Sequence, residues 1–218
     1  MKTIKLFLVL AIALFAFASC SENIGDSEEA VAAEMDEKSV EVAALCGTCD
    51  FTGTLTEAEV TSLMLMREEE KFAREVYLAM NTLYNYRVFA NIAKSENAHT
   101  SAVLCIMKGF GLSDPSPVNT TEFRNPMFTD LYAQLTEKGS VSLVEALKVG
   151  AFIEEYDIAD LQRHLAATDN AMVARVYGNL LRGSKLHLKA FTNALKVQGA
   201  TYTPTVISEE EYQNIINN

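Results

Sequence analysis

Apolar residues recur every three or four positions along the chain from residue 54 to its end. This spacing places them on one face of an α-helix, whereas a strand would alternate apolar and polar residues. Such alternation never extends over more than a few residues here. The pattern predicts four long helices and two short ones, over residues 56–83, 86–110, 127–138, 142–167, 168–198 and from 208 onward.

Residues that start and stop helices support these boundaries. Thr56–Glu59 and Ser142–Glu145 have the spacing of a capping box, in which the first and fourth residues bond to each other's backbone N–H. Glycines that favour helix ends mark the ends of three of the segments, at Gly109 and Gly111, at Gly139 and at Gly199. Three prolines between residues 112 and 126 predict an irregular crossover there.

The order of these elements predicts the fold class. Four long helices in two pairs, with a longer crossover between the pairs, are typical of a four-helix bundle with ferritin-like connectivity. We therefore expect an all-α chain whose residues 54–218 form such a bundle, with short extra helices.

Ionisable residues interrupt the apolar stripe of every long helix near its middle. A single buried carboxylate would cost several kcal/mol unless it were paired. Four helices that bury such groups at similar depth are best explained by a bound cation. The candidate ligands are four carboxylates and two imidazoles: Glu70, Glu96, His99, Glu154, Asp157 and His187.

The spacing Glu96-x-x-His99 is the most specific element of this set, because residues three apart on a helix lie on one face. Carboxylate and imidazole ligands suit two iron ions, or two manganese ions, held about 3.5–4 Å apart by bridging carboxylates. Tyr77 and Tyr177 on the inner stripes and Glu155 beside them are candidate supporting residues. The catalytic residues are left open.

A metal-free interpretation of the same stripe remains open. The inner acids would then pair with Arg74, Lys148 or Tyr77 as a polar network. The other acids of the first helix, Glu68, Glu69 and Glu75, are expected on its solvated face. His164 is expected to be partly exposed, and Cys105 to pack as a small apolar residue.

The first 19 residues have the form of a targeting signal: Lys2 and Lys5, an apolar run, and a small-residue processing site. Cys20 follows directly, and residues 17–20 resemble the lipobox of bacterial lipoproteins. That resemblance implies acylation of Cys20 and a lipid-anchored location in a bacterial cell envelope, periplasmic or outer-membrane. Ordinary secretion is the alternative, and the lipid would be the protein's only contact with a membrane.

Residues 20–53 form a separate segment in composition. Residues 21–50 carry nine acidic residues against one basic, Lys38, and no aromatic residue, which predicts a disordered tether. Near its end, Cys46 and Cys49 are predicted to form a local disulfide, with a redox pair or half of a zinc site as alternatives. The net charge of -11 argues against nucleic acid as a partner.

The motifs at these positions resemble those of the ferritin-like di-iron superfamily, rubrerythrins included. The residues that carry the resemblance are Glu70-x-x-Ala73-Arg74-x-x-Tyr77 and Phe89-x-x-Ile92-Ala93-x-x-Glu96-x-x-His99. Met66–Lys71, Ile153–Ile158 and Arg182–Leu188 resemble more closely an uncharacterised ferritin-like family of bacteria and archaea. This resemblance covers about residues 55–212; it implies the bundle and the metal site, but no reaction.

One position departs from the rubrerythrin pattern. Where the fourth helix of rubrerythrins carries a second Glu-x-x-His, this chain has Ser184 before His187. Asp157, one turn after Glu154, is the candidate replacement. The rubredoxin module, which is the electron donor within rubrerythrins, has no counterpart here.

Three functions are therefore compared. The first is an exported di-iron oxidoreductase that oxidises ferrous iron or reduces peroxide or oxygen. The second is a protein that binds or sequesters metal without turnover, and the third a metal-free helical interaction module on the cell envelope. A homodimer is compatible with each of them.

Overall fold

The computed structural model describes residues 51–116 and 121–218. Helices account for nearly all of the regular structure there, and these residues contain no strand. The prediction of an all-α fold is confirmed for these residues. In chain order the helices are α2 (Glu57–Tyr84), α3 (Arg87–Gly109), α4 (Pro126–Gly139), α5 (Leu143–Ala167), α6 (Ala171–Val197) and α7 (Glu209–Asn217).

The helix ends follow the predicted caps closely. Thr56 and Glu59 form both halves of the capping box that starts α2. At the start of α5 the Ser142 hydroxyl accepts the backbone N–H of Glu145, but the carboxylate of Glu145 pairs with Lys148 instead of closing the box. One half of that second predicted box is therefore absent.

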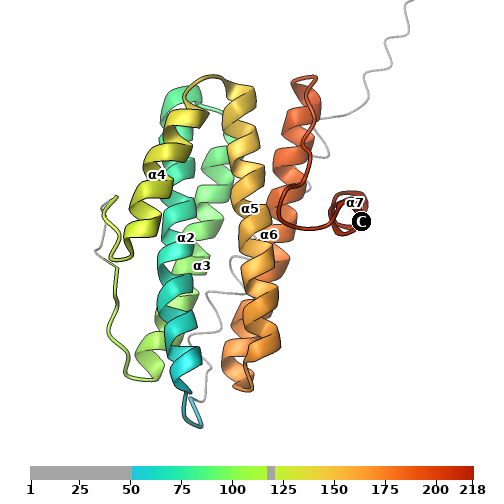
Figure 1. Ribbon diagram of the computed structural model, residues 1–218. Helices are drawn as coiled ribbons and strands as arrows, with labels where there is room; N and C mark the ends of the chain where they lie inside the picture. The colour runs from blue at the N-terminus through green and yellow to red at the C-terminus, as the bar shows by residue number, and fades with distance from the viewer. Residues whose placement is uncertain (1–50, 117–120) are drawn as a thin grey trace, which may run out of the picture.

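The four long helices run side by side in two pairs (Figure 1). α2 packs along α3, and α5 packs along α6. The pairs meet through contacts of α3 with α6 and of α2 with α5. The short helix α4 lies against α2 and α5, and α7 lies against α6. None of the helices in the described part of the chain is long and apolar enough to cross a membrane.

A band of polar residues divides the apolar core into two parts. One part, which includes Leu63 and Val103, lies toward the start of α2. The other, which includes Tyr77 and Phe191, lies toward its end. Between these two parts every long helix contributes buried ionisable groups.

Candidate metal centre

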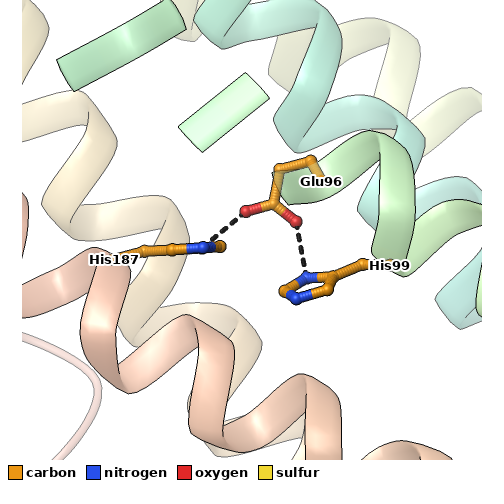
Figure 2. A group of neighbouring side chains, drawn as sticks. All are labelled: Glu96, His99 and His187. Atoms are coloured by element: carbon orange, nitrogen blue, oxygen red, sulfur yellow. Dashed lines mark hydrogen bonds and ion pairs between the residues drawn. The ribbon is translucent and has the colours of Figure 1, made fainter. Parts of the chain in front are cut away.

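The carboxylate of Glu96 lies between two imidazoles at the centre of the helices (Figure 2). Its Oε1 is 2.7 Å from Nδ1 of His187, and its Oε2 is 2.9 Å from Nδ1 of His99. The two rings are stacked with centroids 5.3 Å apart. All three side chains are buried, with 2% exposure or less. Glu96 and His99 come from α3 and His187 from α6, so the packing of α3 against α6 forms this cluster.

Two further carboxylates approach the same histidine nitrogens. Oε2 of Glu70, from α2, is 3.2 Å from Nδ1 of His99. Oε2 of Glu154, from α5, is 3.3 Å from Nδ1 of His187. Each Nδ1 thus faces one oxygen of Glu96 and one oxygen of a second acid. The cluster thus has two similar halves that share Glu96: His99 with Glu70, and His187 with Glu154.

Asp157 lies beside these groups and is held by Ser184. The Ser184 hydroxyl donates to Oδ2 of Asp157, so the serine that replaces the expected glutamate contacts the aspartate proposed to substitute for it. Oδ1 of Asp157 and Oε1 of Glu70 have no hydrogen-bond partner although both are buried. Buried polar atoms are rarely left unpaired, so these two oxygens are candidate metal ligands.

Two side chains orient the ligand groups from outside. The Tyr77 hydroxyl donates to Oε1 of Glu154 at 2.5 Å, which leaves Oε2 to face His187. Nε2 of His187 lies 2.9 Å from the hydroxyl of Ser95. A partner on the second ring nitrogen fixes the orientation of a metal-binding histidine. Tyr77 was predicted from the sequence, whereas Ser95 was not, since a serine beside a glutamate carries no distinctive spacing.

Gly183 provides the space that the His99 ring occupies. A Cβ at this position would lie 2.5 Å from Cε1 and 2.6 Å from Nε2 of His99. Any larger residue on this turn of α6 would displace the imidazole. In the sequence Gly183 is only one residue of the Arg182–Leu188 motif, because its close approach to His99 joins two helices that are distant in sequence.

The charges of the cluster depend on one another. Burial alone raises the pKa of Glu96, but His187 and His99 outweigh it and hold that pKa below its usual range. Burial lowers the pKa of His187, but Glu96 and Glu154 raise it to about 9. Burial raises the pKa of Glu70, and although His99 lowers it, the net shift is well above the usual range.

Asp157 and Glu154 show the same upward direction. For both groups burial is the largest cause of the raised pKa. Without a metal ion the imidazoles and these three acids therefore hold their protons more tightly than they would in water. A metal ion needs deprotonated ligands, so binding at these atoms would release protons.

Two predicted supporting residues are not brought to the cluster. The hydroxyl of Tyr177 lies 2.8 Å from that of Ser62, within the apolar part of the core that contains Leu63. Glu155 is buried but faces the segment before α7, where it accepts the backbone N–H groups of residues 205–207 and the Tyr202 hydroxyl. Glu155 therefore anchors a loop.

The prediction that Glu68 and Glu69 lie on a solvated face is wrong. Both are 4% exposed. Glu68 accepts the backbone N–H groups of Arg124 and Asn125 ahead of α4, so it also anchors a loop. Glu69 faces α5 and has no hydrogen-bond partner on either oxygen. α2 is covered by α3, α4 and α5, which leaves little of it open to solvent.

The remaining predictions concern Glu75, the partners offered by the metal-free interpretation, and His164. Glu75, also expected on the solvated face, has a side chain that is only 14% exposed and pairs with Arg74, while Lys148 pairs with Glu145. Of the three partners that the metal-free interpretation offered, only Tyr77 contacts an acid of the cluster. His164 is half-buried at the side of the Tyr177 ring, so it is partly exposed as expected.

Cys105 was expected to pack as a small apolar residue. This expectation is wrong, because Cys105 is disulfide-bonded. The other three cysteines of the chain are Cys20, Cys46 and Cys49, and they lie outside the described residues. The same holds for the predicted signal at residues 1–19 and for the predicted tether up to residue 50.

Comparison with known proteins identifies the family. Residues 59–218 match the family described as "Uncharacterized protein domain (DUF2202)". The chain belongs to this family. The uncharacterized protein MJ0754 of Methanocaldococcus jannaschii is 45% identical over 164 residues, which cover 75% of this chain and 89% of that protein.

A solved structure shares the DUF2202 fold. The crystal structure of the hypothetical protein MJ0754 from Methanococcus jannaschii is 43% identical, with a TM-score of 0.75. The match covers 78% of this chain and 98% of the solved one. At this level of identity the arrangement of helices is common to both proteins.

The prediction of a lipid-anchored protein in a bacterial envelope is wrong. The relative and the solved structure both come from an archaeon, a cell that has neither an outer membrane nor a periplasm. The lipobox interpretation of Cys20 inferred a bacterial compartment from four residues, whereas the relative of known source is archaeal.

Proposed function

We propose that this DUF2202 protein binds a pair of iron or manganese ions in its helical core and uses them in oxidation–reduction chemistry. The observation that carries the proposal is the position of Glu96, whose two oxygens each approach the Nδ1 of a different histidine. A carboxylate in this position can bridge two cations, each with one imidazole.

The donor set fits such a pair. It consists of carboxylate oxygens and imidazole nitrogens, which iron and manganese favour, and contains no thiolate among the residues described. The unpaired oxygens of Glu70 and Asp157 point to the same conclusion, because a completed polar network would leave no buried acceptor without a partner. Glu70 and His99 would hold one ion, and Glu154, Asp157 and His187 the other.

The surrounding residues prepare the ligands for this task. Ser95 fixes the ring of His187 so that Nδ1 faces the carboxylates. Ser184 holds Oδ2 of Asp157 and leaves Oδ1 free. Tyr77 keeps its proton, because burial raises the pKa of its hydroxyl and Glu154 raises it further. The apolar parts of the core above and below exclude bulk water.

Carboxylate-bridged iron pairs supply electron transfer to or from oxygen, peroxide or ferrous iron in the ferritin-like superfamily. The assignment of this chain to that superfamily is part of the proposal. It is supported by the two pairs of long helices, by the long connection between α3 and α5, and by the Glu96-x-x-His99 spacing. Ser184 marks the departure from rubrerythrins, and Asp157 would compensate for it.

Metal analysis of the full chain tests the proposal. Protein loaded with ferrous iron or manganese and then dialysed should retain two ions per chain. Glu96→Ala and His187→Ala should each lose this binding, whereas the half-buried His164→Ala should keep it. Retention of no metal under any loading condition would contradict the proposal and favour a metal-free network.

Turnover separates a catalyst from a carrier. The loaded protein should accelerate the oxidation of ferrous iron by peroxide or oxygen, and Glu96→Ala should remove that acceleration. Bound metal without any turnover would support sequestration, the second of the three functions, and would contradict the redox part of the proposal.

A further inference from the structure

A small cavity adjoins the candidate metal centre between α2, α4 and α5. Its volume is about 50 Å³. One water molecule needs about 10–15 Å³ of such space, so the cavity has room for a few waters or a partly hydrated cation. Its wall on α4 is apolar, with Phe128, Leu131 and Leu135. The opposite wall carries carboxylates: Glu69, Glu70, Glu96, Glu154 and Asp157.

Glu69 is the member of this wall that the metal pair leaves unexplained. Its side chain is almost entirely buried, and neither oxygen has a hydrogen-bond partner. Burying a carboxyl group without any partner is destabilising, whether or not it carries charge. Glu68, its neighbour in sequence, accepts two backbone N–H groups. A glutamate buried on this turn of α2 can therefore find backbone partners, and Glu69 has none.

The charges that act on Glu69 come from α5. Asp157 and Asp160 are both acidic, and Arg163 is the opposing charge. Arg163 forms a double hydrogen bond with Asp160 at 2.8 and 2.9 Å, and its side chain is 60% exposed. The arginine therefore neutralises Asp160 near the surface. Glu69 and Asp157 line the cavity, and both oxygens of Glu69 and Oδ1 of Asp157 have no hydrogen-bond partner.

We propose that Glu69 and Asp157 hold a divalent cation in this cavity, at a position formed by carboxylate oxygens and separate from the two histidines. Oxygen ligands without imidazole suit hard cations such as Mn²⁺ or Mg²⁺. The inference rests on the proposed function, because Asp157 also lies beside the histidine cluster. It adds a ligand, Glu69, and a cation position that the bridging role of Glu96 does not require.

Manganese titration of the full chain tests this position. Glu69→Gln keeps the shape of the side chain and removes its charge. We expect this variant to bind one Mn²⁺ fewer per chain than the unaltered protein while it keeps the ions that depend on His187. Glu57→Gln is the matched control, since it makes the same charge change on an exposed turn of α2, and it should bind as the unaltered protein does. Equal stoichiometry and affinity in all three proteins would overturn the inference and leave only water in the cavity.

The result distinguishes this inference from the proposed function. If the unaltered protein binds no manganese, both fail; if it binds manganese and Glu69→Gln binds the same amount, only the cavity position fails. Anomalous diffraction from manganese-soaked crystals of the unaltered protein gives a second measurement that needs no variant. A manganese peak beside Glu69 is expected, and its absence from crystals with occupied histidines would overturn the inference.

Discussion

Two sets of buried carboxylates in this protein differ in what surrounds them. Glu59, Glu68 and Glu155 accept backbone N–H groups from loops that lie far away in sequence. Glu70 and Glu154 each face a histidine and Asp157 lies beside them, and one oxygen each of Glu70 and Asp157 has no partner. Backbone N–H groups of the protein satisfy the first set, whereas under the proposed function a bound cation would complete the second.

The two sets are interleaved along the helices. Glu68 and Glu70 are two residues apart on α2, and Glu154 and Glu155 are adjacent on α5. Burial is therefore a poor guide to function in this molecule, because both sets are equally buried. The distinguishing property is whether the backbone satisfies the oxygens. The predictions below test that distinction, starting with the largest expected effect.

Adjacent substitutions on α5 should have opposite consequences. Glu155→Gln weakens hydrogen bonds to three backbone N–H groups and should lower the free energy of unfolding by about 2–4 kcal/mol, with metal content unchanged. Glu154→Gln should leave the stability of the metal-free protein within about 1 kcal/mol and remove metal binding. Thermal melts and metal analysis of both variants provide the measurement. Similar effects of the two changes on both quantities would remove the distinction.

The close approach at Gly183 should be the next most sensitive feature. Gly183→Ala places a methyl group against the His99 ring and should lower metal content and cost about 1–3 kcal/mol of stability. Gly178→Ala on the same helix has nothing within 4 Å of the added Cβ, so it should be neutral or stabilise by up to about 1 kcal/mol. Undiminished metal binding by Gly183→Ala would show that His99 is not held as a ligand.

The partner of His187 should affect affinity more than folding. Ser95→Ala removes the group next to Nε2 and should weaken metal binding by roughly 10–100-fold. Ser101→Ala on the exposed side of the same helix is the control, because that hydroxyl bonds only to the backbone of its own helix. Competition with a chelator of known affinity measures both variants. Identical affinities would contradict a supporting role for Ser95.

A dependence on pH should be the smallest effect. The pKa of His187 rises from its usual 6.5 to about 9 in the metal-free protein. Its contribution to stability is fully present below about pH 6.5 and is lost as the pH rises through about 9. Melting temperatures of chelator-treated protein should therefore fall across this window, and less so in His187→Gln. The control His164→Gln should show the same fall in melting temperature with pH as the unaltered protein. The same fall in His187→Gln would contradict the assignment to His187.

The sequence was sufficient for the helices and for part of the centre. Helix positions follow from the 3.6-residue period and the caps, which are local signals, as at Thr56. Glu96, His99 and His187 could be selected because an ionisable group in an apolar stripe is visible in a single helix. These three residues do come together in the structure.

The remainder depended on contacts between distant segments. No local pattern shows that Glu155 anchors residues 205–207, or that Glu68 anchors the start of α4. The burial of Glu69 depends on the packing of α4 and α5 against α2, which follows from no periodicity within α2 itself. The space for His99 depends on Gly183 from another helix. Such facts become available only when the helices are placed together.

The central claim is that metal ions bind at the carboxylate of Glu96. The most direct test is anomalous diffraction at the iron edge from crystals of the iron-loaded protein. We predict iron peaks on either side of the Glu96 carboxylate, one within ligand distance of Nδ1 of His99 and the other of Nδ1 of His187. A structure that contains iron elsewhere, or none, while Glu96 remains directly paired with both histidines would contradict the account.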